Sequence, residues 1–102
     1  MIITSYGYDI DQYFVRAAKK YKCRSISIIY SWDNPTSKGY KSSDSDYYLV
    51  WNETMKKELI TFHDIDENKI KICGIAHWDT FFNNLENKDQ IKTNFLKKNN
   101  LS

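Results

Sequence analysis

A chain of 102 residues, of which 41% are hydrophobic and 27% are charged, forms at most one domain of ordinary globular composition. Its formal net charge of +2 is too small to indicate nucleic acid or an anionic membrane surface as a partner. Cys23 and Cys73 stand far apart in the sequence and match no paired zinc or disulfide motif, so we expect neither a metal site nor a disulfide framework.

The first part of the chain predicts a strand, a helix and another strand. Residues 1–5 indicate the end of a short strand, and Asp9 is a candidate cap for the helix that follows. Residues 25–30 are compact and rich in isoleucine, which predicts a largely buried strand. Apolar residues at helical spacing predict the intervening helix, and we expect them to form its buried stripe: Ile10, Tyr13, Phe14, Ala17, Ala18 and Tyr21.

Residues 31–46 show no periodicity and are rich in serine and aspartate. A connection of this length is uncommon in a compact domain, where about 4–6 residues are typical. The segment is therefore either a functional loop or disordered. Beyond it, residues 47–51 predict another buried strand.

A second helix is predicted to begin after Asn52, which is a favourable N-cap residue. Its expected buried stripe contains Met55, Leu59 and Phe62. The helix should end near His63, where an imidazolium would suit the helix dipole and would have a structural role.

The last part of the chain predicts one more strand and two helical pieces. Residues 70–73 indicate a strand that Gly74 closes, and residues 78–82 are a short apolar segment. Asn87 is a candidate cap for a helix that continues to residue 98, with Gln90 completing a capping box.

Strands that alternate with helices predict an α/β fold, here a partial Rossmann-like parallel sheet of three to four strands flanked by helices on both faces. We expect residues 1–82 to form this domain and residues 83–102 to form a helical tail that leads toward a missing second domain. Ligands of such sheets bind beyond the carboxyl ends of the strands. In this chain those ends are the turn after Ser5, the loop from Ser31 and the turn from Gly74.

The loop after residues 25–30 begins with several side chains that could shape a polar ligand cleft: Ser31, Trp32, Asp33, Asn34 and Lys38. Alternatively, Trp32 packs over the end of the sheet, while Asp33 and Asn34 hydrogen-bond the turn before Pro35. The residue types alone leave both interpretations open.

His77 and Asp79 follow the last predicted strand, on the side of the sheet where ligands bind. One histidine without a placed partner is weak evidence for catalysis, and Asp79 either caps a short helix or points into a cleft. Gly74 predicts a special backbone angle or a close approach where the chain leaves the sheet. The sequence contains no GxGxxG, P-loop, HExxH or GxSxG motif, so no complete catalytic apparatus is visible.

Three runs of this sequence resemble GT-B-fold glycosyltransferases. SWDN followed by TSKG occupies positions 31–39, and DYYLVWNETMKKE occupies positions 46–58. Residues 69–79, KIKICGIAHWD, look like the V-x-G-x-x-x-x-D turn that closes the amino-terminal Rossmann-like domain of that family. UDP-N-acetylglucosamine 2-epimerases and CDP-glycerol glycerophosphotransferases share this architecture, and the similarity covers roughly residues 8–98.

The resemblance implies the later part of the acceptor-side domain of a nucleotide-sugar-dependent glycosyltransferase, without the pyrophosphate-binding site and without a cofactor of its own. A nucleotide-sugar and a cell-surface glycan or lipid acceptor would be partners only in a full-length parent, so the chain alone would be inactive. An inverting enzyme needs a general base for the acceptor hydroxyl, and Asp33 and His77 are the catalytic candidates. The residues that would bind substrate are Ser31, Trp32, Asn34, Lys38, Gly74 and Asp79.

A different hypothesis is a small stand-alone α/β binding module without catalysis, which an ordered 31–46 segment and a stable monomer would favour. A third is a truncated reading frame. A sheet of three or four parallel strands also leaves open edges, at which we expect self-association through Ile28, Tyr48, Val50 and Ile70. No apolar run approaches the roughly 20 residues of a membrane span, and no signal-peptide pattern is present, which indicates a cytoplasmic location.

Overall fold

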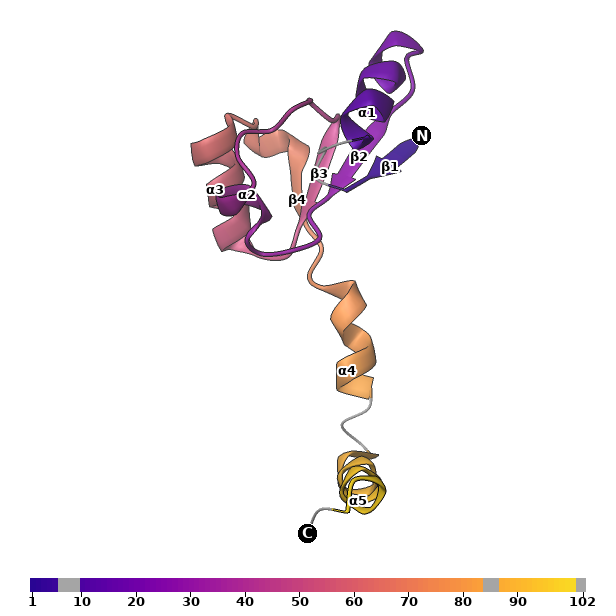
Figure 1. Ribbon diagram of the computed structural model, residues 1–102. Helices are drawn as coiled ribbons and strands as arrows, with labels where there is room; N and C mark the ends of the chain where they lie inside the picture. The colour runs from indigo at the N-terminus through magenta and orange to yellow at the C-terminus, as the bar shows by residue number, and fades with distance from the viewer. Residues whose placement is uncertain (6–9, 84–86, 101–102) are drawn as a thin grey trace.

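The computed structural model describes residues 1–5, 10–83 and 87–100. Within these ranges one parallel sheet has the order β1-β2-β3-β4 (Figure 1). The strands are β1 Ile2–Thr4, β2 Ser25–Ile28, β3 Tyr47–Val50 and β4 Ile70–Ile72. The α/β class is therefore confirmed, with four strands as the upper end of the prediction.

Helices connect the strands and continue beyond the last one. They are α1 Asp11–Lys20, α2 Asn34–Ser37, α3 Glu53–His63, α4 Asp79–Asn83 and α5 Lys88–Lys98, with short 3-10 turns η1 Glu67–Lys69 and η2 Ala76–Trp78. The segment 31–46 is an ordered connection that contains α2, so the structure favours the loop over disorder.

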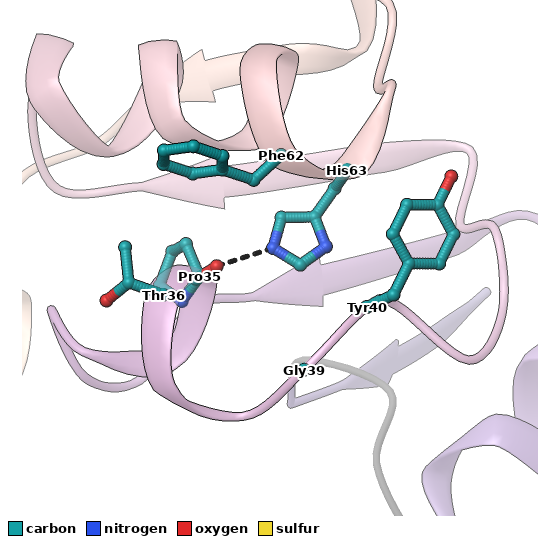
Figure 2. Close-up of a pocket in the computed structure, with 6 residues that line it drawn as sticks. All are labelled: Pro35, Thr36, Gly39, Tyr40, Phe62 and His63. Atoms are coloured by element: carbon teal, nitrogen blue, oxygen red, sulfur yellow. Dashed lines mark hydrogen bonds between the residues drawn. The ribbon is translucent and has the colours of Figure 1, made fainter.

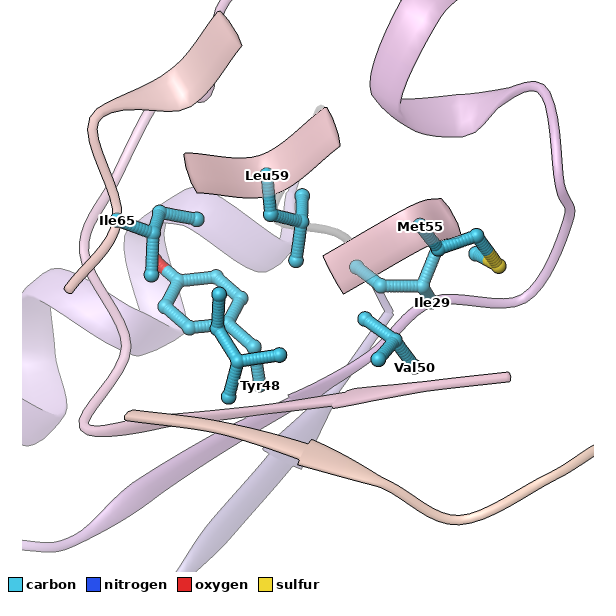
Figure 3. Packing of buried hydrophobic residues seen from close by; sticks show 7 residues of the cluster. Ile29, Tyr48, Val50, Met55, Leu59 and Ile65 are labelled. Atoms are coloured by element: carbon cyan, nitrogen blue, oxygen red, sulfur yellow. The ribbon is translucent and has the colours of Figure 1, made fainter. Parts of the chain in front are cut away.

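One face of the sheet is covered by helices. Each strand is added on the same side of the previous one, so right-handed crossovers place the connecting helices on one face. Buried positions alternate along the strands on that face, as at Ser25 and Ser27 in β2 and at Tyr48 and Val50 in β3. Figure 3 shows the apolar cluster between this face and α3: Ile29, Tyr48, Val50, Met55, Leu59, Ile65 and Ile70.

The described residues leave the opposite face of the sheet partly open. Ile3, Ile28 and Tyr47 expose 58%, 39% and 40% of their surface on that face. Parallel sheets normally bury both faces. These exposed side chains show instead that helices cover one face in the part of the chain that the structure describes, so the prediction of helices on both faces is wrong there. Among the residues predicted for self-association, Tyr48, Val50 and Ile70 are buried, and only Ile28 lies on the open face.

Helix α1 buries only part of the predicted stripe. Ala18 is buried as predicted, and so is Val15, which the prediction left out, whereas Tyr13, Phe14 and Tyr21 are exposed. Small side chains on the buried face let the helix approach the sheet closely. The buried residues of β1 and β2 are small as well: Thr4, Ser25 and Ser27.

Helix α3 follows the prediction at its start and departs from it at its end. The Asn52 side chain accepts a hydrogen bond from the Met55 backbone N–H at 3.0 Å, which confirms the predicted N-cap. Met55 and Leu59 are buried as predicted, but Phe62 is 55% exposed. His63 occupies the third buried position instead, because it lies one turn beyond Leu59 on the same face.

Two other predicted caps have different outcomes. Asn87 makes no side-chain bond to the first turn of α5, so neither the cap nor the capping box with Gln90 forms. Its φ of −108° and ψ of 17° are not the extended conformation that directs a cap oxygen toward the helix. Asp9 lies outside the described residues; at the start of α1, the Asp11 carboxylate accepts the Ser5 backbone N–H at 3.0 Å.

Helices α4 and α5 extend away from the sheet (Figure 1). The molecule measures 58 × 26 × 22 Å, and its radius of gyration is 18.4 Å. A compact chain of about 100 residues would have a radius of gyration of about 13 Å. Neither helix has a buried residue among those described, so the core lies between β1 and β4 in the sequence.

Candidate functional site

A hollow of about 410 Å³ opens at the carboxyl ends of β2, β3 and β4. Ile28 and Leu49 line it from the open face of the sheet, and Tyr30, Trp51 and His77 contribute rings. We call this space the carboxyl-edge hollow. Its position is the one at which parallel α/β sheets bind ligands.

The rings beside the hollow contact one another. His77 stacks on Tyr30 with ring centroids 4.8 Å apart and planes 12° from parallel. Trp51 lies tilted against His77 at 5.5 Å and against Trp78 at 5.6 Å. Such offset and tilted arrangements are the favourable geometries of aromatic pairs, so each ring restrains its neighbours.

Trp51 is anchored to the sheet. Its indole Nε1–H donates to the Ile29 carbonyl oxygen at 2.8 Å, which ties the residue after β3 to the end of β2. The side chain also packs against the apolar core. A half-buried tryptophan that uses its one polar atom internally presents its remaining ring surface to the hollow.

Gly74 makes the turn that brings His77 back over the strand ends. Its φ is +77°, in the left-handed region that favours glycine, which confirms the predicted special backbone angle. A Cβ at this position would meet nothing within 4 Å. The requirement for glycine therefore comes from the backbone conformation and not from lack of space.

Asp33 belongs to a separate polar cluster at the start of α2. Ser31 Oγ donates to one carboxylate oxygen, and Ser37 Oγ donates to the other at 3.0 Å. These hydrogen bonds, first that from Ser31, lower the pKa of Asp33. A carboxylate with a lowered pKa is a weaker proton acceptor at neutral pH, so this geometry suits a turn-stabilising role better than that of a general base.

The other candidates from the same loop lie apart from the hollow. Trp32 is 67% exposed, so it does not pack over the end of the sheet. Asn34 begins α2, and Lys38 is exposed just after it. Asp79 begins α4 and is also exposed.

Of the sequence-predicted site residues, the structure brings Gly74 and His77 together at the hollow and Ser31 with Asp33 at the start of α2. Tyr30 and Trp51 were not predicted as site residues. Both follow the ends of neighbouring parallel strands, and that shared position is the signal that could have identified them.

Neither a metal-binding cluster nor a membrane-spanning helix is found among the described residues. Residues 1–5, 10–83 and 87–100 bring together no group of three histidine, cysteine or acidic side chains that could hold a metal ion. Over the same ranges, no helix combines the length and apolar character needed to cross a bilayer.

Comparisons with protein-family models, with curated proteins and with solved structures found no match for this chain.

Proposed function

We propose that this chain is one α/β unit of a GT-B-type nucleotide-sugar glycosyltransferase and that its carboxyl-edge hollow binds the acceptor saccharide. The observation that carries this proposal is the set of rings from Tyr30, Trp51 and His77 beside an apolar floor at the strand ends. A sugar ring offers a face of C–H groups, which suits the electron-rich face of an aromatic ring. The volume of about 410 Å³ lies in the range of small-molecule sites.

Within this proposal, His77 is the favoured general base for the acceptor hydroxyl. Imidazole is the side chain most often used in general acid–base catalysis, and His77 lies in the hollow itself. Asp33 is the weaker candidate because Ser31 and Ser37 hold its carboxylate. The sequence has no glycine-rich phosphate loop, so the nucleotide-sugar would bind to other parts of a full-length parent, and this unit alone would not transfer sugar.

Two accompanying proposals concern association and location. The apolar residues Ile3, Ile28 and Tyr47 on the open face would drive self-association of the isolated chain. A cytoplasmic location is supported by Cys23 and Cys73, which are both free and exposed, as is usual in a reducing compartment.

The test is an NMR titration of the isotope-labelled chain with a panel of neutral oligosaccharides and, separately, with UDP and CDP. We expect saturable shifts for the Trp51 indole N–H and for the signals of Tyr30 and His77 with at least one saccharide, and none with either nucleotide. The indole of Trp32 is exposed elsewhere and reports non-specific binding. If no saccharide moves the signals of the hollow, the proposal is wrong.

The second candidate is a stand-alone α/β binding module without catalysis. The observation that favours it is the order of segment 31–46, which is bonded to α3 and to β2. A folded monomer that binds none of the saccharides would support this function. Sedimentation analysis of the same sample supplies the oligomeric state.

A further inference from the structure

His63 is a buried histidine at the end of α3, with 1% of its surface exposed. Its Nε2 lies 2.6 Å from the carbonyl oxygen of Pro35 (Figure 2). Its Nδ1 accepts the backbone N–H of Lys41 at 3.1 Å. A carbonyl oxygen can only accept and an amide N–H can only donate, so the ring must be neutral with its proton on Nε2. The imidazolium expected at this helix end is therefore wrong.

The ring joins α3 to two points of segment 31–46. Pro35 lies in α2, and Lys41 lies between α2 and β3. Between them, Tyr40 stacks on the His63 ring with centroids 5.6 Å apart. This part of the segment borders a hollow of about 280 Å³, which Phe62 also lines.

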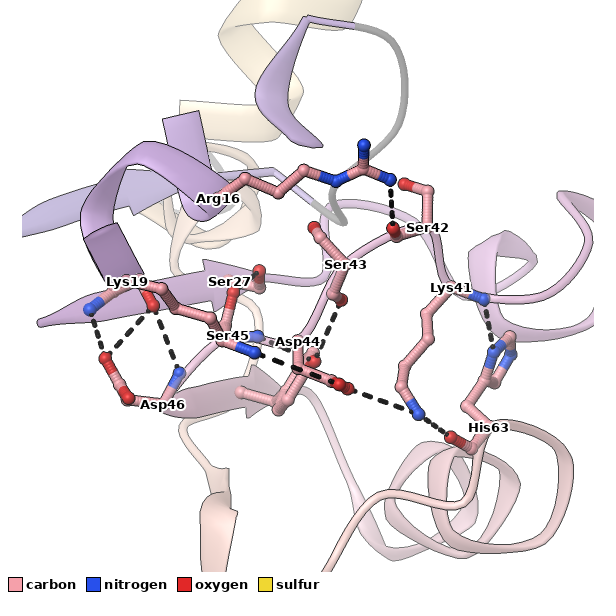
Figure 4. Close-up of polar contacts among 12 residues, drawn as sticks. Arg16, Lys19, Ser27, Lys41, Ser42, Ser43, Asp44, Ser45, Asp46 and His63 are labelled. Carbon is pink, nitrogen blue, oxygen red and sulfur yellow. Dashed lines mark hydrogen bonds and ion pairs between the residues drawn. The ribbon is translucent and has the colours of Figure 1, made fainter. Parts of the chain in front are cut away.

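The remainder of the segment is bonded to other elements (Figure 4). Asp46 accepts the Ser25 backbone N–H at 2.7 Å, and Ser45 Oγ lies 2.7 Å from Ser27 Oγ. These bonds hold the C-terminal end of the segment to β2. The part that contains Pro35 and Lys41 depends on His63 in a way that the C-terminal end does not.

Protonation of the ring would reverse the role of Nδ1. An Nδ1–H would face the Lys41 N–H, so two donors would meet where a hydrogen bond now exists. The new charge would also lie near the Lys41 ammonium, which donates to the His63 carbonyl oxygen. A buried cation that loses a hydrogen bond is unfavourable, so protonation opposes the position in which Pro35 and Lys41 lie against α3.

Other charged and titratable groups near the ring are already engaged. Asp44 pairs with the Lys41 ammonium at 3.3 Å, and Asp64 accepts the Tyr40 hydroxyl at 3.2 Å. The carbonyl groups at the end of α3 favour a cation, but the one on His63 itself is used by Lys41. The nearby negative groups therefore do not replace the acceptor that an imidazolium would need.

We propose that His63 is a pH-sensitive latch, which holds residues 34–41 against α3 when it is neutral and releases them when it is protonated. Release opens the hollow beside Phe62 and moves the start of α2, while the β2 attachments of Asp46 and Ser45 remain. The latch does not depend on the proposed sugar-binding function.

The experiment uses the full chain carrying His77→Gln, which leaves His63 as the only imidazole. Long-range ¹⁵N NMR at about pH 8 should show the Nε2–H tautomer. When the pH is lowered to about 5, the His63 ring signals and the amide signals of Thr36 and Lys41 should change together. The exchange protection of the Lys41 amide should fall several-fold, while the amides of β3 stay protected.

His63→Gln provides the matched variant, since its amide cannot titrate in this range. Its Lys41 signal should lose the pH response. Three results would overturn the latch. The first is an Nδ1–H tautomer, and the second is that the loop amide signals stay unchanged when the ring signals change. The third is simultaneous loss of the loop and β3 signals. If His63→Gln does not fold, the tautomer and the loop response in His77→Gln still decide the question.

Discussion

Replacement of Gly74 by alanine tests whether the turn after β4 needs glycine for its backbone angle alone. The φ of Gly74 is +77°, and an added Cβ would meet no atom within 4 Å. An alanine held in this left-handed region lowers the free energy of unfolding by about 1–2 kcal/mol. No further loss is expected from a clash with neighbouring atoms. Gly39 offers a matched control, because its φ is +80° and its Cβ position is equally open.

The expected result is that Gly74→Ala and Gly39→Ala destabilise the chain by similar amounts. Each kcal/mol lowers the Tm of a domain of this size by about 4–8 °C, which thermal unfolding followed by circular dichroism resolves easily. Gly74→Asn should lose less than Gly74→Ala, because asparagine tolerates the left-handed region better. The two glycines should differ in one respect: only the change at Gly74 should disturb saccharide binding, since Gly74 lines the carboxyl-edge hollow.

Two outcomes would refute this reasoning. If Gly74→Ala unfolds at the same temperature as the unmodified chain, the turn does not hold the observed angle in solution. If Gly74→Ala lowers the free energy of unfolding by more than about 4 kcal/mol, the loss has a magnitude typical of severe core disruption. A contact absent from this structure must then be involved.

Three more predictions follow from single contacts. Asn52→Ala removes the α3 cap and should lower the free energy of unfolding in urea by about 1 kcal/mol. Asn87→Ala, at a position where no cap bond exists, should cause no measurable loss. Equal losses in the two variants would contradict the assignment of the cap to Asn52. Because hydrogen bonds from Ser31 and Ser37 lower the pKa of Asp33, they stabilise the fold above the ordinary carboxyl pKa and are lost as the pH falls through the lowered value. Asp33→Asn should therefore lower Tm at neutral pH and have no effect in stronger acid, and a loss that persists in acid would exclude this linkage. Ile28→Lys, on the open face, should shift sedimentation toward monomer without loss of helix content, and an unchanged distribution would remove that face from the interface.

The order of the four strands and of the longer helices was predictable because it depends on local patterns, whereas the short helix α2 inside segment 31–46 was not predicted. Alternating strand and helix signals gave the α/β class, and the residue type at Asn52 was enough to predict a cap that the structure confirms. Gly74 was predictable for the same reason, since a glycine directly after a strand indicates a special backbone angle.

What could not be predicted depends on contacts between distant segments. The predicted apolar stripe of α1 contains large residues such as Tyr13 and Phe14, which are exposed. The helix packs instead through Ala18 of that stripe and through Val15, because the facing strands carry small side chains. A similar limit applies to His63: its role is defined by Pro35 and Lys41, which lie more than twenty positions away.

The candidate site contains a residue that was predictable from the sequence and contacts that were not. His77 was predicted from its place after the last strand, whereas its stacking on Tyr30 and its contact with Trp51 required knowledge of which strands are neighbours. Asp33 had the residue type of a general base, but the hydroxyl groups that occupy its carboxylate come from the turn around it.

The most direct test of the account compares saccharide affinity in His77→Ala and Asp33→Ala, measured by calorimetry with the saccharide that shifts the Trp51 signal. His77 lies in the carboxyl-edge hollow and Asp33 does not line it, among the residues that the structure describes. We predict that His77→Ala weakens binding about tenfold or more, equivalent to about 1.4 kcal/mol, and that Asp33→Ala binds like the unmodified chain. Equal affinities in all three proteins, or a loss confined to Asp33→Ala, would contradict the hollow as the binding site.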